Sequence, residues 1–168
     1  ARTRLLSWRG KARAALEPLL PRTDGDDDLG LTVRRRFGTE VYDRALEIRP
    51  DDAAVCNNRG LALEASGRLD AALDSYDHAI RLKPDLAEAH YNRGNALRAM
   101  RRLDQAIDSY GRATELRPNF ADAYNNRGNV LRNLRRLDGA LDSYDRALEI
   151  QPESPEICNN RGNVLLDL

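Results

Sequence analysis

The chain has 168 residues, of which 41% are hydrophobic and 32% charged, a composition typical of an ordinary soluble domain or a short repeat array. It carries 27 basic and 27 acidic side chains, so no overall charge excess favours binding to nucleic acid or to an anionic membrane. No apolar run approaches the roughly 20 residues needed to span a bilayer. We therefore expect a soluble, cytoplasmic protein without membrane association.

Residues 1–52 are expected to form a divergent first unit that contains an inserted loop. The segment SWRGKARAAL at 7–16 aligns with NNRGNVLRNL further along the chain. We therefore predict a helix at 3–17 and its partner at roughly 36–48, separated by an insertion near 18–35. The opening is also Arg-rich and amphipathic, as mitochondrial transit peptides are, and it begins with Ala1 rather than Met, so targeting stays open.

The insertion contains four aspartates, at positions 24, 26, 27 and 28. Alternating acids are typical of calcium loops, but Leu29 occupies the place of the sharp-turn glycine. Arg35 occupies the place of the bidentate glutamate. The pattern therefore favours a solvated acidic loop, neutralised by the arginines at 34–36, over a metal site.

From residue 53 onward the sequence repeats every 34 residues. The most regular stretch occurs as CNNRGLAL at 56–63, HYNRGNAL at 90–97, YNNRGNVL at 124–131 and CNNRGNVL at 158–165. Each unit holds two segments of helical period, for example 87–100 and 104–116, closed by a proline. We therefore predict helical hairpins at 53–86, 87–120 and 121–154, followed by the first helix of a truncated unit at 155–168.

Small residues recur inside both predicted helices of each unit. The first helix contains a glycine, which costs about 1 kcal/mol relative to alanine in a helix interior. The second helix carries recurring alanines. The two rows are Gly60, Gly94, Gly128 and Gly162 in first helices, and Ala72, Ala106 and Ala140 in second helices. We predict that glycine and alanine together permit a close helix crossing.

Helix ends also carry recognisable signals. Asp85 and Asn119 are expected to cap the first helices that follow them, and Ser154 with Pro155 fits an N-cap followed by a first-turn proline. The link between the two helices of a unit contains Gly67 in the first complete unit, and arginine at the corresponding positions 101 and 135 of the later units. We expect those two corners to be less relaxed.

The arrangement resembles the tetratricopeptide repeat in its 34-residue period, its two helices and the Ala, aromatic, Ala, Pro series of the second helix. The resemblance covers 53–154, the half unit at 155–168, and Tyr42, Ala45 and Pro50 of an earlier second helix. It departs from the family at positions 56, 90, 124 and 158, where the usual tryptophan is absent. The resemblance implies an all-α fold, a right-handed α-solenoid of antiparallel helix hairpins whose first helices line a concave groove.

Asparagines recur two residues before and one residue after the glycine, on a face of the first helix that differs from the packing face. The rows are Asn58, Asn92, Asn126 and Asn160, and Asn95, Asn129 and Asn163. An amide offers donors and an acceptor, so it can pair with peptide backbone whatever the side chain. We predict a peptide-binding groove, although these asparagines are also what a merely solvated helix would carry.

Arg98 and Arg132 are expected at the edge of this groove, where they either attract acidic side chains or form solvated surface. The carboxylate clamp of chaperone-binding repeats is excluded, because its cations are replaced by Asn57, Asp122 and Asn126. The first asparagine row is also similar to the ladder in the superhelix of O-linked N-acetylglucosamine transferases. Nothing in the chain resembles the catalytic half of those enzymes.

No set of residues indicates catalysis. Cys56 and Cys158 lie three units apart, too far for a disulfide, and are expected to be core thiols. His78 and His90 lie on different helices without a set of metal-ligating partners, so neither a metal nor a cofactor is predicted.

The sequence therefore predicts a non-catalytic scaffold that binds an extended segment of a protein partner in its concave groove. The identity of the partner is left open. Two alternatives remain: the substrate-recognition segment of a larger O-linked N-acetylglucosamine transferase-like enzyme, and a scaffold that self-assembles head to tail through its open end faces.

Overall fold

The computed structural model describes residues 39–167, and within this range the chain forms eight α-helices and no strand. The prediction of an all-α fold is thereby confirmed. The predicted helix at 3–17 and the insertion at 18–35 lie outside the described residues. The helices are α3 (Glu40–Ile48), α4 (Ala53–Ala65), α5 (Leu69–Leu82), α6 (Ala87–Ala99), α7 (Leu103–Leu116), α8 (Ala121–Asn133), α9 (Leu137–Ile150) and α10 (Pro155–Asp167).

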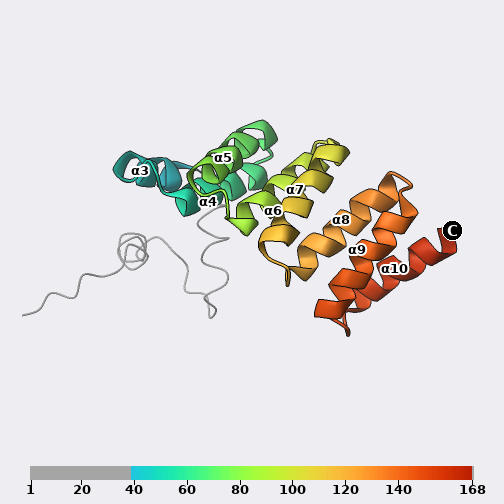
Figure 1. Cartoon of the computed structure of the whole chain (residues 1–168). Coiled ribbons are helices and arrows are strands. Elements are labelled where there is room, and N and C mark those ends of the chain that lie inside the picture. Colours follow the sequence, from blue (N-terminus) through green and yellow to red (C-terminus); the bar gives the residue numbers. More distant parts are fainter. Residues whose placement is uncertain (1–38, 168) are drawn as a thin grey trace, which may run out of the picture. The chain divides into compact units, whose positions relative to one another are not determined.

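The helices pack in consecutive antiparallel pairs, α4 with α5, α6 with α7 and α8 with α9, and each pair contacts the next one along the chain (Figure 1). We call α4, α6, α8 and α10 the first helices, and α3, α5, α7 and α9 the second helices. Each second helix contacts the first helix that follows it, and α4 also contacts α6, as α8 contacts α10. The described residues are therefore a stack of hairpins in which first helices meet directly across unit boundaries.

The closest helix crossing in each hairpin joins a glycine to a tyrosine ring. Tyr76, Tyr110 and Tyr144 have none of their surface exposed. A Cβ atom added at the glycine sixteen residues earlier would lie 2.4–2.7 Å from the ring Cε1 atom, which is closer than real Cβ atoms come. The prediction that glycine permits a close crossing is confirmed, but the group that fills the space is the tyrosine ring rather than an alanine.

Each of the three corners between paired helices requires one residue with positive φ. Gly67 has a φ of 75°, while Arg101 has 62° and Arg135 has 59°. The hydrogen bonds are those of a Schellman motif; for example, the Arg102 N–H donates to the Leu97 carbonyl at 2.9 Å. A side chain in this conformation costs roughly 1–2 kcal/mol, so the expectation of strained corners at the two arginines is confirmed.

Helix capping differs from the sequence-based expectation. Helices α6 and α8 begin at Ala87 and Ala121, so their N-cap positions are Leu86 and Phe120, neither of which makes a side-chain cap. The predicted caps at Asp85 and Asn119 are therefore wrong. The corresponding position in α4 is Asp52, whose Oδ1 accepts from the N–H groups of residues 54 and 55. Helix α10 begins at Pro155, as predicted.

The glycine–tyrosine contact predicts that alanine is tolerated only where no ring is present. Gly128→Ala should destabilise the protein by about 1–2 kcal/mol, because the added carbon overlaps the buried ring of Tyr144. Gly162→Ala is the matched control, since its Cβ would meet no atom within 4 Å and alanine is the better helix former. Urea unfolding followed by circular dichroism measures both changes, and equal effects of the two substitutions would contradict the role of the ring.

Candidate peptide-binding face

The asparagines two residues before the glycine join neighbouring first helices. In three cases the Nδ2 group donates to a side chain of the preceding first helix, at the position three residues before its glycine. The pairs are Asn92 with Asn57 Oδ1 (3.0 Å), Asn126 with the Tyr91 hydroxyl (3.0 Å) and Asn160 with Asn125 Oδ1 (3.0 Å). These side chains therefore have a structural role that the sequence analysis missed. Asn58 makes no side-chain hydrogen bond within the described residues.

The asparagines one residue after the glycine bind the buried tyrosines. The Tyr110 hydroxyl donates to Asn95 Oδ1 at 2.7 Å, and the Tyr144 hydroxyl donates to Asn129 Oδ1 at 2.8 Å. In the first complete hairpin, where leucine occupies this position, the Tyr76 hydroxyl donates instead to Glu64 Oε2 at 2.8 Å. Each buried hydroxyl thus receives an acceptor from the first helix of its own hairpin, which offsets the cost of burying it.

The two rows are left with opposite hydrogen-bonding groups. Asn126 and Asn160 use Nδ2 within the stack and keep Oδ1 as an acceptor, whereas Asn95 and Asn129 use Oδ1 and keep Nδ2 as a donor. These four side chains are half-buried, while Asn92 is only 8% exposed. We call the surface formed by both rows on the first helices the amide face. One of its rows is left with acceptors, and the other is left with donors.

Two arginines extend the amide face at the position four residues after the glycine. Arg98 is exposed, and Arg132 is half-buried with its Nη1 atom buried and without a hydrogen-bond partner. Burial raises the pKa of the Tyr110 hydroxyl, and the charge of Arg98 works against that rise. Burial likewise raises the pKa of Tyr144 to about 12, opposed by the charge of Arg132. The arginines therefore lie beside the tyrosine hydroxyls that the asparagines bind.

The two cysteines have different environments, so the expectation of two core thiols is wrong for one of them. Cys56 is buried in a cluster with Ala79 and Ala89, which belong to the two helices that follow α4. Cys158 is exposed, because α10 has no following helix among the described residues. Both are free thiols, and burial raises the pKa of Cys56.

The histidines make local contacts rather than forming a site. His78 Nδ1 lies 3.6 Å from the Cys56 sulfur, and His90 Nε2 lies 3.0 Å from the Pro84 carbonyl oxygen. Burial lowers the pKa of His90. Within residues 39–167, no group of three His, Cys, Asp or Glu side chains is arranged to hold a metal ion.

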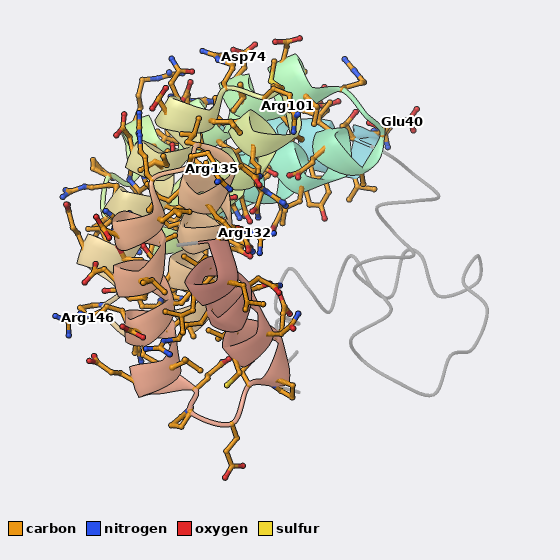
Figure 2. All side chains as sticks on the ribbon, turned by 90° about the vertical axis from the view of Figure 1, so that its right-hand side faces the viewer. Glu40, Asp74, Arg101, Arg132, Arg135 and Arg146 are labelled. Carbon is orange, nitrogen blue, oxygen red and sulfur yellow. The ribbon has the colours of Figure 1, made fainter. Side chains whose placement is uncertain are left out.

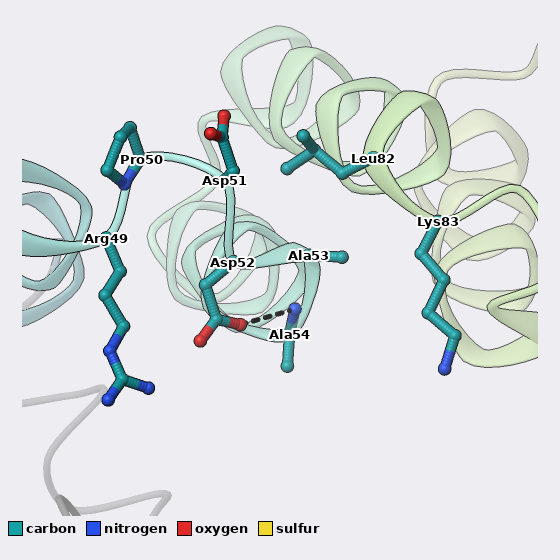
Figure 3. A pocket seen from close by; sticks show the side chains of 8 residues that line it. All are labelled: Arg49, Pro50, Asp51, Asp52, Ala53, Ala54, Leu82 and Lys83. Atoms are coloured by element: carbon teal, nitrogen blue, oxygen red, sulfur yellow. Dashed lines mark hydrogen bonds between the residues drawn. The ribbon is translucent and has the colours of Figure 1, made fainter.

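Surface hollows in the stack lie at the links between units. Figure 3 shows the one between the α3–α4 link and the end of α5, where Asp52 caps α4 and Arg49 and Lys83 point outward. A second hollow is formed by Gln151–Ser154, at the link before α10. Neither hollow is lined by residues of the amide face. No helix of the described part of the chain is both long and apolar enough to cross a membrane.

Protein-family models of the tetratricopeptide repeat match residues 91–155 and 65–100. No curated protein matches the chain. The crystal structure of MamA is similar, with a TM-score of 0.76, 23% identity and coverage of 88% of this chain and 86% of that one. The first repeat domain of Spaghetti (RPAP3), bound to the HSP90 peptide SRMEEVD, has a TM-score of 0.66 and 25% identity, covering 68% and 91%. The Arabidopsis OM64 domain has a TM-score of 0.66 and 22% identity, covering 69% and 96%.

The buried Tyr144 hydroxyl makes folding stability depend on pH. An unfolded tyrosine ionises near pH 10, whereas the folded hydroxyl stays neutral up to about pH 12. Its stabilising effect is therefore complete below pH 10 and is lost as pH rises from 10 towards 12. Tyr144→Phe should cost about 1 kcal/mol at pH 9, and the deficit should shrink at pH 11. Urea unfolding at the two pH values measures this, and an unchanged deficit would contradict it.

Proposed function

We propose that this chain of tetratricopeptide repeats is a non-catalytic interaction scaffold whose amide face binds an extended segment of a partner protein. The observation that supports this most directly is the alternation of free groups: Asn126 and Asn160 keep acceptors, and Asn95 and Asn129 keep donors. An extended peptide offers N–H and C=O groups along both edges of its backbone, and these match such rows without regard to side chains.

The spacing of the repeats suits an extended ligand. Packed helices are roughly 8–10 Å apart, and an extended chain advances about 3.3–3.6 Å per residue. One unit would therefore meet about every third residue of the ligand. Because neighbouring asparagines are bonded to each other or to tyrosines, their free groups are held in place before binding, which lowers the entropic cost of association.

Arg98 and Arg132 favour a segment that carries acidic side chains. The buried Nη1 atom of Arg132 lacks a partner within the described residues, and a ligand carboxylate would supply one. The peptide bound to the RPAP3 domain is acidic as well. In the present chain, however, the positions of the carboxylate clamp are held by Asn57, Asp122 and Asn126, so we propose recognition of an internal segment rather than of a free C-terminus.

A selection experiment tests the amide face and does not require the partner to be identified. Peptides selected from a random displayed library on the whole chain should be rich in acidic residues. Arg132→Gln and Asn126→Ala should each weaken the selected peptide at least about tenfold, or roughly 1.4 kcal/mol, by titration calorimetry. Methylation of the peptide backbone nitrogens should weaken binding as well, because it removes the donors that face Asn126 and Asn160.

Arg146→Gln is the matched control for this experiment. Arg146 lies on α9 and is paired with Glu149, and Figure 2 shows it projecting from the outer edge, away from Arg132. Its replacement should leave the affinity unchanged. Selected peptides that bind Arg132→Gln and Asn126→Ala as tightly as the wild type would contradict the proposed function, provided that circular dichroism shows both variants to be folded.

The glycosyltransferase alternative rests on the asparagine row alone. In the present chain much of that row joins first helices to each other, a role that any stack of this kind would use. We therefore favour the scaffold.

Self-assembly is a second candidate function, favoured by the distribution of exposed apolar side chains. The large hydrophobic residues that are exposed within 39–167 all lie on the terminal helices α3 and α10. They are Ile48 (81% exposed), Leu165 (49%) and Leu166 (87%). A head-to-tail stack of copies would cover both ends, because the C-terminal face of one copy would meet the N-terminal face of the next.

Two single variants test this assembly. Light scattering should show that the mass of the wild-type protein rises with concentration, whereas Leu166→Glu and Ile48→Glu should each be monomeric because one end is blocked. An equimolar mixture of the two variants should form dimers through the pair of intact ends. A wild-type protein that stays monomeric at high concentration, or a mixture that stays monomeric, would exclude head-to-tail assembly.

A further inference from the structure

A row of arginines, one residue before each glycine, holds carboxylates of the preceding second helix. In three of four cases the Nε–H group donates to an aspartate that lies sixteen residues earlier in the chain. The pairs are Arg59 with Asp43 (2.5 Å), Arg93 with Asp77 (2.6 Å) and Arg161 with Asp145 (2.5 Å). The repeated geometry defines a carboxylate position between neighbouring units.

The fourth arginine has no such partner. Gly111 stands where the aspartate should be, and the Nε atom of Arg127 is buried without a hydrogen-bond partner. The second contact of the row is also lost. Arg93, for comparison, donates through Nη1 to Ser109 Oγ at 2.7 Å. Both Ser109 and Ser143 donate to the carbonyl four residues earlier, but within the described residues no hydrogen bond joins Arg127 to Ser143. An arginine built into a carboxylate-binding position therefore lacks its carboxylate.

The space of the missing side chain is open. A Cβ atom added to Gly111 would meet no atom within 4 Å. In the complete pairs the aspartates are 41–51% exposed and the arginines 29–39% exposed, so the position is reached from solvent. We call this gap beside Arg127 the Gly111 notch.

No nearby acid of the chain fills the notch. Asp108 lies one turn before Gly111 on α7, but it makes no ion pair within the described residues. Asp74 is the residue of α5 that corresponds to Asp108. It projects outward in Figure 2, and Arg93 pairs with Asp77 instead. The register of the helix thus directs only the position of Gly111 towards the arginine.

We propose that the Gly111 notch is a docking site for one aspartate or glutamate side chain of a partner protein. The partner's carboxylate takes the place of the missing aspartate and accepts hydrogen bonds from Arg127, as the carboxylate of Asp77 does from Arg93. A charged hydrogen bond to a buried guanidinium nitrogen is stronger than one between neutral groups. The notch lies between Gly111 of α7 and Arg127 of α8, and Arg127 belongs to neither asparagine row of the amide face.

Arginine side-chain NMR tests the site directly. The probe is N-acetyl-aspartic acid amide, titrated into the full-length protein at constant ionic strength, and the uncharged N-acetyl-asparagine amide is its isosteric control. The Nε–Hε signal of Arg127, assigned by its loss in Arg127→Lys, should shift downfield and approach saturation with the aspartate probe only. The signals of Arg59, Arg93 and Arg161 should not respond, because their carboxylate positions are occupied.

Gly111→Asp and Gly111→Ala form a matched pair. The new aspartate side chain should itself occupy the notch. The Arg127 signal should therefore be shifted without any probe and should no longer respond to the aspartate probe. The aspartate should also raise the melting temperature by a few degrees above that of the wild type, because the new ion pair adds to a modest gain in helix propensity over glycine. Gly111→Ala should still respond to the probe, since a methyl group leaves Arg127 unpaired.

Three results would overturn the proposal: an Arg127 signal that does not respond to the aspartate probe, one that responds equally to the asparagine probe, or a response that persists in Gly111→Asp. The peptide affinity of the amide face should be unchanged in Gly111→Asp. The proposal for the notch and the proposal for the amide face can therefore be refuted independently of each other.

Discussion

The contact between a glycine of the first helix and a tyrosine ring of the second helix, made in all three complete hairpins, is the constraint on which the rest of the stack depends. It brings the backbone of the first helix against the ring, and it places the ring fully inside the hairpin. A buried ring brings a buried hydroxyl with it, and that hydroxyl needs an acceptor. The asparagines and the glutamate of the first helices supply it, so one packing contact determines which face of the first helix carries amides.

The polar layer that results connects the helices of neighbouring units and supports the proposed peptide-binding face. Asn126 and Asn160 use Nδ2 towards the preceding unit, and Asn95 and Asn129 use Oδ1 towards a tyrosine, so each of these amides has one polar group left over. Side chains fixed in this way lose little freedom when a ligand arrives. The first helices tolerate so many polar residues because their buried face is narrow: beside the glycine and the alanines, it needs only a few aliphatic side chains such as Leu63, Leu97 and Val130.

Departures from the repeat mark the places where the units differ in backbone strain and in the polar groups that lack a partner. Arginines with positive φ at two corners keep the hairpin geometry at a cost in strain that glycine avoids. The glycine at position 111 keeps the helix but removes a carboxylate, which leaves Arg127 without its usual partner. Units with the same backbone therefore present different surfaces.

The sequence by itself determined the helical hairpins, their 34-residue register and the rows of asparagines, because repetition reports which positions share an environment. It did not determine how each amide is used, since a polar residue that faces solvent and one that joins two helices have the same period. The tertiary structure decided that Cys158 is exposed and how the asparagines are used. The bonds to the preceding unit are made by Asn92, Asn126 and Asn160, and the bonds to tyrosines by Asn95 and Asn129. These outcomes depend on which side chains of neighbouring units come within bonding distance, and that distance is set by packing between units rather than by the pattern within one.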